Sequence, residues 1–75
     1  MKLDTTTVEK FAERVRTLRL EKQLTQIEFA RKLNVSKSTV GLWETGGRMP
    51  SIAMLMHIAD FFNITTDYLL GRVDY

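Results

Sequence analysis

The sequence of 75 residues predicts an all-α fold of five short helices, compact and without strands. Apolar residues recur at separations of three and four, which is the period of one helix face. Serine or threonine precedes most of these runs, where a side-chain oxygen can cap a helix. Asparagine, glycine or proline follows most of them, where helices tend to end. A chain of this length has room for one domain, expected to be 1–75, with 1–6 and 72–75 frayed.

The first helix is expected at about 7–22. Thr6 followed by Glu9 has the spacing of a capping box, in which each side chain bonds the backbone amide of the other residue. The apolar face of this helix has members at the separations of a buried stripe: Val8, Phe11, Val15 and Leu18.

The second helix is expected at about 26–33, with a second capping box at Thr25 and Glu28. Phe29 and Leu33 have the four-residue separation of a buried pair. Asn34 ends the helix, because asparagine tolerates the left-handed conformation that a sharp helix-terminating turn needs.

The third helix is expected at about 37–44, with Ser36 as its cap. Val40 and Trp43 are its inward anchors, so we interpret Trp43 as a core residue rather than one that stacks on a base. A helix this short is marginal alone and needs a scaffold. Gly41 in the middle of this helix weakens it by roughly 0.5–1 kcal/mol relative to alanine. Either another molecule approaches the backbone closely there, or a neighbouring helix packs tightly against it.

The rest of the chain predicts two more helices after the loop that ends at Pro50. Ser51 caps a helix at about 52–62, and Asn63 ends it. Thr65 or Thr66 caps a short fifth helix that ends at Gly71. The predicted core comprises Phe11, Val15, Leu18, Phe29, Ala30, Leu33, Val35, Val40, Trp43, Leu55, Ile58, Ala59, Phe62, Ile64, Leu69 and Leu70.

The composition is that of a soluble globular protein, with 44% hydrophobic and 27% charged residues and a formal net charge of +2. Cysteine is absent, which is compatible with a reducing cytoplasm, where we expect the protein to act. No apolar run approaches the ~20 residues that span a bilayer. The N-terminal sequence lacks the apolar centre of a secretory signal. We therefore expect no association with a membrane.

Catalytic and metal chemistry have little support in the sequence. His57 is the only histidine, and no cysteine is present to complete a metal site. The carboxylates occur singly, mostly beside lysine or arginine, as on solvated helix faces. Gly46 and Gly47 follow a helix and do not lie between a strand and a helix, so they are no phosphate-binding loop. We expect neither an enzyme nor a cofactor, metal or small-molecule effector.

The segment TQIEFARKLNVSKSTVGLWETG, residues 25–46, resembles the helix-turn-helix of the phage repressor and Cro family, the xenobiotic-response-element type of bacterial regulator. The resemblance covers roughly 9–71. The matching positions within the motif are Gln26, Ala30, Asn34, Val40, Trp43, Glu44 and Gly46, and those outside it are Arg19, Pro50, Ile58, Ala59, Asp67, Tyr68, Leu69 and Leu70. It implies a compact five-helix repressor-like DNA-binding domain, with the helix-turn-helix formed by the second and third helices.

The resemblance implies a sequence-specific regulator of transcription, a repressor, that inserts its third helix into the major groove of double-stranded DNA. Residues expected to contact bases are Lys37, Ser38, Gly41 and Leu42. Residues expected to contact phosphates are Gln26, Ser36, Thr39, Thr45 and Arg48. The family often has a longer polar side chain at the position of Leu42. The leucine of this chain could instead touch a thymine methyl group. Lys37 and Arg48 could also be plain solvated charges, and Ser36 only a cap.

In the resembling family an arginine at the position of Arg19 pairs with a glutamate at the position of Glu44, which fixes the orientation of the recognition helix. Removing one partner of such a buried pair costs ~3–5 kcal/mol.

The family usually binds as two-fold dimers on half-sites about one DNA turn apart. We expect a homodimer on a double-stranded DNA operator, with Phe61, Tyr68, Val73 and Tyr75 as candidate dimer contacts. The apolar arc that Met54, His57 and Phe61 add to the fourth helix could equally be ordinary core. The alternative function is a small helical protein-interaction or antitoxin-like module with the same fold, and the chain could also be a fragment of a longer repressor.

Overall fold

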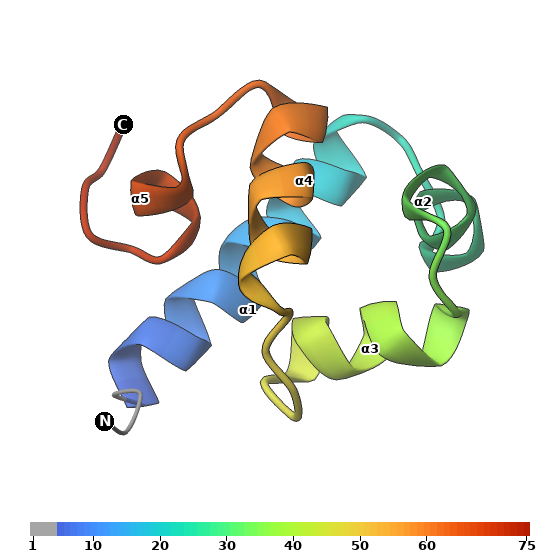
Figure 1. The fold of residues 1–75 in the computed structure, drawn as a ribbon, viewed down its shortest axis with the longest axis horizontal. Helices are drawn as coiled ribbons and strands as arrows, with labels where there is room; N and C mark the ends of the chain where they lie inside the picture. The colour runs from blue at the N-terminus through green and yellow to red at the C-terminus, as the bar shows by residue number, and fades with distance from the viewer. Residues whose placement is uncertain (1–4) are drawn as a thin grey trace.

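The computed structural model describes residues 5–75, which form five helices in the predicted order (Figure 1). The helices are α1 (Thr5–Glu21), α2 (Gln26–Leu33), α3 (Lys37–Thr45), α4 (Ile52–Phe62) and α5 (Thr66–Leu69). No strand occurs in this part of the chain, so the all-α prediction is confirmed. None of these helices is both long and apolar enough to cross a membrane.

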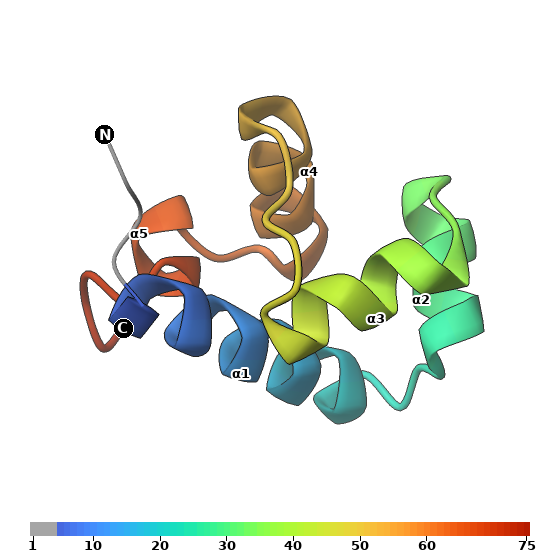
Figure 2. The same cartoon turned by 90° about the horizontal axis from the view of Figure 1, so that it is seen from below.

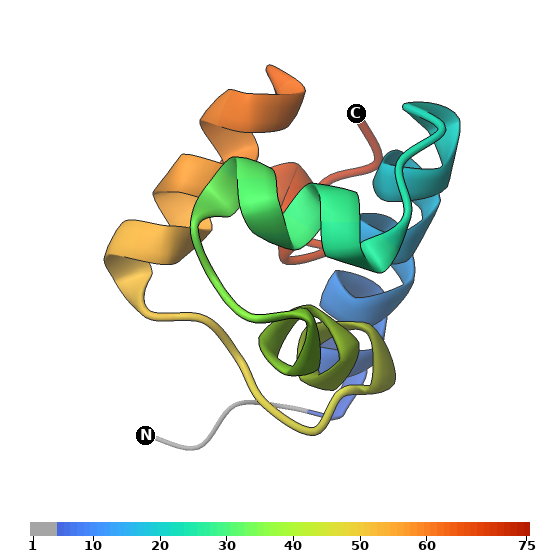
Figure 3. The same cartoon turned by 90° about the vertical axis from the view of Figure 1, so that its right-hand side faces the viewer.

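The third helix lies between two supports. It packs against both α1 and α2, while α5 packs against α1 and α4. Figure 2 shows α3 above α1, with α4 rising away from them. In Figure 3, α2 crosses the front of the molecule and α3 is seen almost end-on below it. The N-terminal end of α3 lies at the opposite side of the molecule from α5 and the C-terminus. The short α3 thus has the scaffold that it needs.

Four helices begin at a serine or threonine whose side-chain oxygen accepts a hydrogen bond from the amide three residues later. These caps are Thr25, Ser36, Ser51 and Thr65. At α2 the capping box is reciprocal, because the Thr25 amide also donates to Glu28 Oε1 at 2.8 Å. Each such cap contributes about 1 kcal/mol. The predicted cap at Thr6 is wrong, since α1 already begins at Thr5 and Thr6 lies within it.

The helices also end in one common way. A residue with positive φ follows each helix, and these residues are Gln23, Asn34, Gly46, Asn63 and Gly71. The amide of the next residue then reaches back to a carbonyl five positions earlier, as in Val35 N to Ala30 O at 2.9 Å and Ile64 N to Ala59 O at 3.0 Å. This bond satisfies a carbonyl that the helix end would leave unpaired. The predicted stops at Asn34 and Asn63 are therefore correct, whereas Gln23 was not foreseen.

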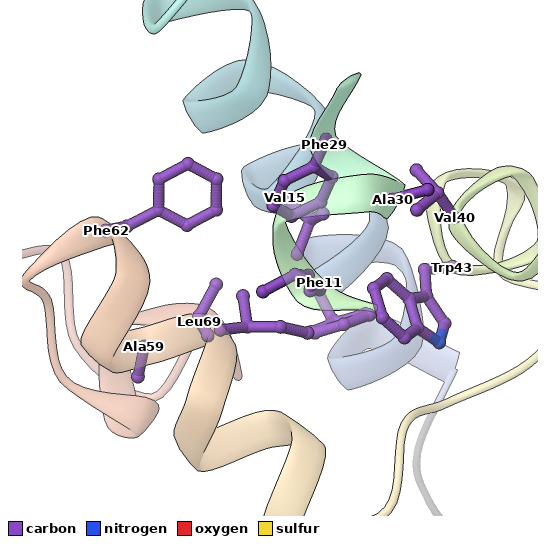
Figure 4. Close-up of a cluster of buried hydrophobic side chains, with 11 residues drawn as sticks. Phe11, Val15, Phe29, Ala30, Val40, Trp43, Ala59, Phe62 and Leu69 are labelled. Carbon is purple, nitrogen blue, oxygen red and sulfur yellow. The ribbon is translucent and has the colours of Figure 1, made fainter. Parts of the chain in front are cut away.

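The core receives side chains from all five helices, and the Phe29 ring is part of an aromatic group within it (Figure 4). That ring lies 5.3 Å from the ring of Phe62 and 6.5 Å from that of Trp43, measured between centroids. Trp43 is only 2% exposed, which confirms it as a core residue. Five predicted core residues are half-buried at the rim instead: Leu18, Val35, Leu55, Ile64 and Leu70. Ala12 is buried and was missed.

The C-terminal segment is attached to α1 through Arg14. Its guanidinium donates to the carbonyl oxygens of Tyr68 and Val73, the latter at 2.7 Å. Its Cζ atom also lies 4.2 Å from the centroid of the Tyr68 ring. The Val73 carbonyl is thus held against α1, and fraying of 72–75 stays a prediction. Of the N-terminal residues expected to fray, 1–4 lie outside the described residues, and the other two belong to α1.

Candidate nucleic-acid interface

One face of α3 is buried and the opposite face is exposed. Val40 and Trp43 are 0% and 2% exposed and anchor the helix in the core. Lys37, Ser38 and Leu42 are exposed on its outer side. Their outward projection is the spatial requirement for a helix that enters a groove, and the structure satisfies it.

Gly41 lies in open space in the middle of α3. A β-carbon built there would have no non-local heavy atom within 4 Å among the described residues. Tight packing against a neighbouring helix of this chain therefore does not explain the glycine, and that alternative is wrong. The approach of another molecule to the helix backbone stays a prediction.

A buried ion pair fixes the C-terminal end of α3 to α1. Arg19 Nε donates to Glu44 Oε2 at 2.6 Å, and Arg19 Nη2 donates to Glu44 Oε1 at 2.9 Å. The two side chains are 8% and 3% exposed. The hydrogen bond to Glu44 raises the pKa of Arg19, although burial acts in the opposite direction. Arg19 Nη1 also donates to the Leu24 carbonyl at 2.8 Å, so the pair joins α1, the following turn and α3.

Gln26 belongs to the same network. Its side-chain nitrogen donates to Glu44 Oε1 at 3.2 Å, and the residue is half-buried. The sequence suggested a phosphate contact for Gln26 and did not foresee this bond. One amide hydrogen remains to donate to a phosphate, and the amide oxygen remains to accept from water. The position of α2 relative to α3 thus depends in part on the side chain that was assigned to DNA.

Several hydroxyl groups assigned to phosphates already have partners within the helix. The Ser36 oxygen accepts from the Thr39 amide at 3.1 Å, and the two hydroxyls lie 2.9 Å apart. Thr45 Oγ1 donates to the Gly41 carbonyl at 3.0 Å. The cap role of Ser36 is therefore established by geometry. Ser36 and Thr45 are exposed, whereas Thr39 is half-buried.

The charge around α2 and α3 is more basic than the whole-chain value suggests. No carboxylate occurs between Glu28 and Glu44, a segment that contains three exposed cations. Glu44 is neutralised by Arg19. The exposed cations of α2, α3 and the loop after α3 are Arg31, Lys32, Lys37 and Arg48. Sequence reasoning missed Arg31 and Lys32, although their position at the end of α2 beside the turn was visible. Such a local surplus attracts a polyanion even when the net charge is small.

The four candidate dimer residues differ in exposure. The Phe61 ring packs 5.7 Å from that of Phe29, with Lys22 Nζ 5.5 Å from its centroid, so Phe61 belongs to the rim of the core. The Tyr68 ring is covered by Arg14, and Val73 is half-buried. Tyr75 is 89% exposed.

The comparisons with known proteins agree on one family. The sequence profile of the helix-turn-helix family matches residues 15–69. YazB, an uncharacterised HTH-type transcriptional regulator of Bacillus subtilis (strain 168), is 41% identical over 59 residues, which cover 79% of this chain and 86% of the relative. The HTH-type transcriptional activator BcrR of Enterococcus faecalis is 39% identical over 61 residues, which cover 81% of this chain. The chain spans 30% of the length of BcrR and 57% of that of another regulator, YobD of Bacillus subtilis (strain 168).

Solved structures show the same arrangement of helices. The SOS-response transcriptional repressor LexA from Eubacterium rectale superposes with a TM-score of 0.80 at 28% identity, covering 93% of this chain and 73% of that one. The restriction-modification controller protein C.AhdI from Aeromonas hydrophila has a TM-score of 0.73 at 32% identity, covering 83% and 94%. The chain therefore belongs to the helix-turn-helix family of DNA-binding transcriptional regulators, of the phage-repressor and Cro type that its sequence resembles.

Proposed function

We propose that this chain binds double-stranded DNA in a sequence-specific manner by placing α3 in the major groove. The observation that supports this most strongly is the two-sided character of α3. Its inner face is locked to the core and to Arg19, while its outer face carries polar, small and cationic groups at the surface. A major groove about 12 Å wide admits a helix presented in this way.

The residues at the start of α3 read bases in this proposal. Lys37 can donate to guanine O6 and N7, and Ser38 can donate to or accept from several bases. Gly41 and Leu42 meet bases one turn further along. The phosphate contacts are Gln26, Ser36, Thr39 and Arg48, whereas Thr45 would have to release its bond to the Gly41 carbonyl to donate to a phosphate. We add Arg31 and Lys32 because both are exposed in the last turn of α2.

The regulator acts as a homodimer on two half-sites in the cytoplasm, by binding alone and without a catalytic step. Two copies double the number of base contacts, and the two-fold axis sets the half-site spacing. Repression is the proposed outcome, because a bound dimer excludes other proteins from the same stretch of DNA. Among the similar proteins, LexA is a repressor and BcrR an activator.

The test is selection of bound sequences from a random pool of duplexes, followed by affinity measurements at several salt concentrations. A common sequence should emerge, and log K should fall steeply with log salt, with a slope of about −0.9 for each phosphate that is neutralised. Sizing the complex on one and on two half-sites measures the number of copies bound.

Substitutions separate the contacts. Lys37→Ala should weaken binding to the selected sequence about tenfold or more and relax the preference at one base position. Arg48→Ala should weaken all duplexes alike and make the salt slope shallower. Arg72→Ala is the matched control, because its side chain is 73% exposed beside Asp67 of α5, and α5 lies at the other side of the molecule from the start of α3 (Figure 1). Absence of a selected sequence together with a flat salt response would favour the protein-interaction module instead.

A further inference from the structure

The outer face of α3 changes in character along its length. Its first turn carries the polar side chains of Lys37 and Ser38. Its second half carries Gly41, Leu42 and Thr45. Residues three and four apart are neighbours on a helix surface, so Ser38, Leu42 and Thr45 form one continuous row with Gly41 beside it. The row is polar at its start and largely apolar at its end.

Thr45 contributes little hydrogen-bond donation to this surface. Its hydroxyl donates to the Gly41 carbonyl at 3.0 Å, with the Leu42 carbonyl 3.3 Å away. A threonine hydroxyl has a single proton, which these backbone acceptors use. The outer surface is left with a methyl group and an acceptor oxygen. Thr45 therefore has no proton to donate to a base edge without breaking this bond.

Leu42 is 39% exposed. Its Cδ2 atom lies only 3.0 Å from the point where a β-carbon of Gly47 would be. The leucine side chain thus lies over the backbone of the turn after α3, in space that only glycine leaves open. A side chain at position 47 would displace the leucine, so Gly47 permits this position of Leu42.

Gly41 leaves a recess next to Leu42. Open space surrounds the position of its missing β-carbon, since no non-local heavy atom of the described chain lies within 4 Å. On the helix surface Leu42 follows this position directly, and Thr45 lies one turn further along. We call Gly41, Leu42 and Thr45 the methyl recess. Its side chains offer methyl groups and one oxygen that can only accept, and Gly41 adds no side chain to it.

We propose that the methyl recess reads the C5 methyl group of a pyrimidine in the major groove, and this inference rests on the proposed entry of α3 into that groove. Thymine presents this methyl there, and 5-methylcytosine presents the same group on a different base. Apolar side chains gain by covering a methyl group, and the Thr45 hydroxyl keeps its bond to the Gly41 carbonyl while they do so. The half-site should then have a base that can accept from Lys37, such as guanine, and a methyl-bearing pyrimidine opposite Leu42.

The test begins with the duplex selected from the random pool and replaces each thymine by uracil, one at a time. Uracil keeps every hydrogen-bonding group and removes only the methyl. One position in each half-site should lose about fourfold in affinity, the effect expected for covering one methyl-sized group. Replacing thymine at that position by cytosine and by 5-methylcytosine then separates the two sources. A preference for 5-methylcytosine over cytosine means that the methyl is read whichever base carries it.

Variants locate the effect in the protein. Leu42→Ala should remove the difference between thymine and uracil, and Gly41→Ala should reduce it by filling the recess. Lys37→Ala should weaken binding but keep the difference, and thermal melting checks that each variant is folded. A selected sequence whose affinity never responds to uracil, or a response that persists in Leu42→Ala, would overturn the inference while leaving DNA binding intact. Failure to select any sequence would instead count against the proposed function.

Discussion

Glu44→Ala should destabilise the domain severely. The substitution leaves the Arg19 guanidinium, whose side chain is 8% exposed, without its two-bond partner, and only the Leu24 carbonyl remains to accept from it. Breaking a buried pair by removing one member costs ~3–5 kcal/mol. A domain of 75 residues has a total stability of about 4–11 kcal/mol, at roughly 0.05–0.15 kcal/mol per residue. The lost pair is therefore a large share of the total.

The assay is urea denaturation together with thermal melting. A loss of ~3 kcal/mol lowers the melting temperature by roughly 12–24 °C in a domain of this size. Glu13→Ala is the control, because Glu13 is an exposed carboxylate on α1. It should change stability by less than about 0.5 kcal/mol.

A double variant separates the charge from the packing. Replacing Arg19 by Met and Glu44 by Leu removes both charges and keeps apolar volume, so it should be less destabilised than Glu44→Ala. The single variants Arg19→Met and Glu44→Leu together with this double variant form a cycle that measures the coupling between the side chains. If the double variant lost as much as the sum of the singles, or if Glu44→Ala left both stability and DNA affinity unchanged, the reasoning would be refuted.

Three further predictions concern single residues. Gly41→Ala should stabilise α3 by roughly 0.5–1 kcal/mol in urea denaturation, because nothing fills the space of the new methyl group, while weakening DNA binding; a variant that gains stability and binds normally would show that DNA does not approach there. Gln23→Gly should raise stability by up to about 1 kcal/mol, since φ at Gln23 is 58° and glycine adopts that conformation without strain; Asn34→Gly should gain less, because asparagine tolerates it better. The hydrogen bonds from Thr25 lower the pKa of Glu28. The parent protein should therefore melt at a higher temperature than Glu28→Gln above the ordinary pKa of about 4.3, and this difference should shrink as the pH falls through the lowered pKa. An unchanged difference at pH 2 would contradict this.

The sequence predicted what is encoded locally. The caps at Thr25, Ser36 and Ser51 and the stops at Asn34 and Asn63 match the structure because each depends on neighbours within a few residues. The burial of Trp43 followed from its three-residue separation from an apolar partner. The start of α1 was placed less well, because Thr6 and Glu9 have the capping-box spacing although the helix begins at Thr5.

Contacts between distant residues could not be predicted from the pattern alone. Arg14 binds backbone carbonyl oxygens more than 50 positions away, and every residue type has a carbonyl, so no sequence signal marks the acceptor. The bond from Gln26 to Glu44 spans 18 positions and is visible only once α2 and α3 are placed. The pairing of Arg19 with Glu44 was anticipated through the family resemblance, and its geometry came from the structure.

The attachment of the C-terminal segment to α1 has a practical consequence. Arg14 holds the carbonyls of Tyr68 and Val73, so the backbone leaves the domain beside α1 and α5. Figure 1 and Figure 2 place this exit far from the first turn of α3. A dye, an affinity handle or a sensor-chip tether joined after Tyr75 would therefore project away from captured nucleic acid and leave the reading surface unobstructed.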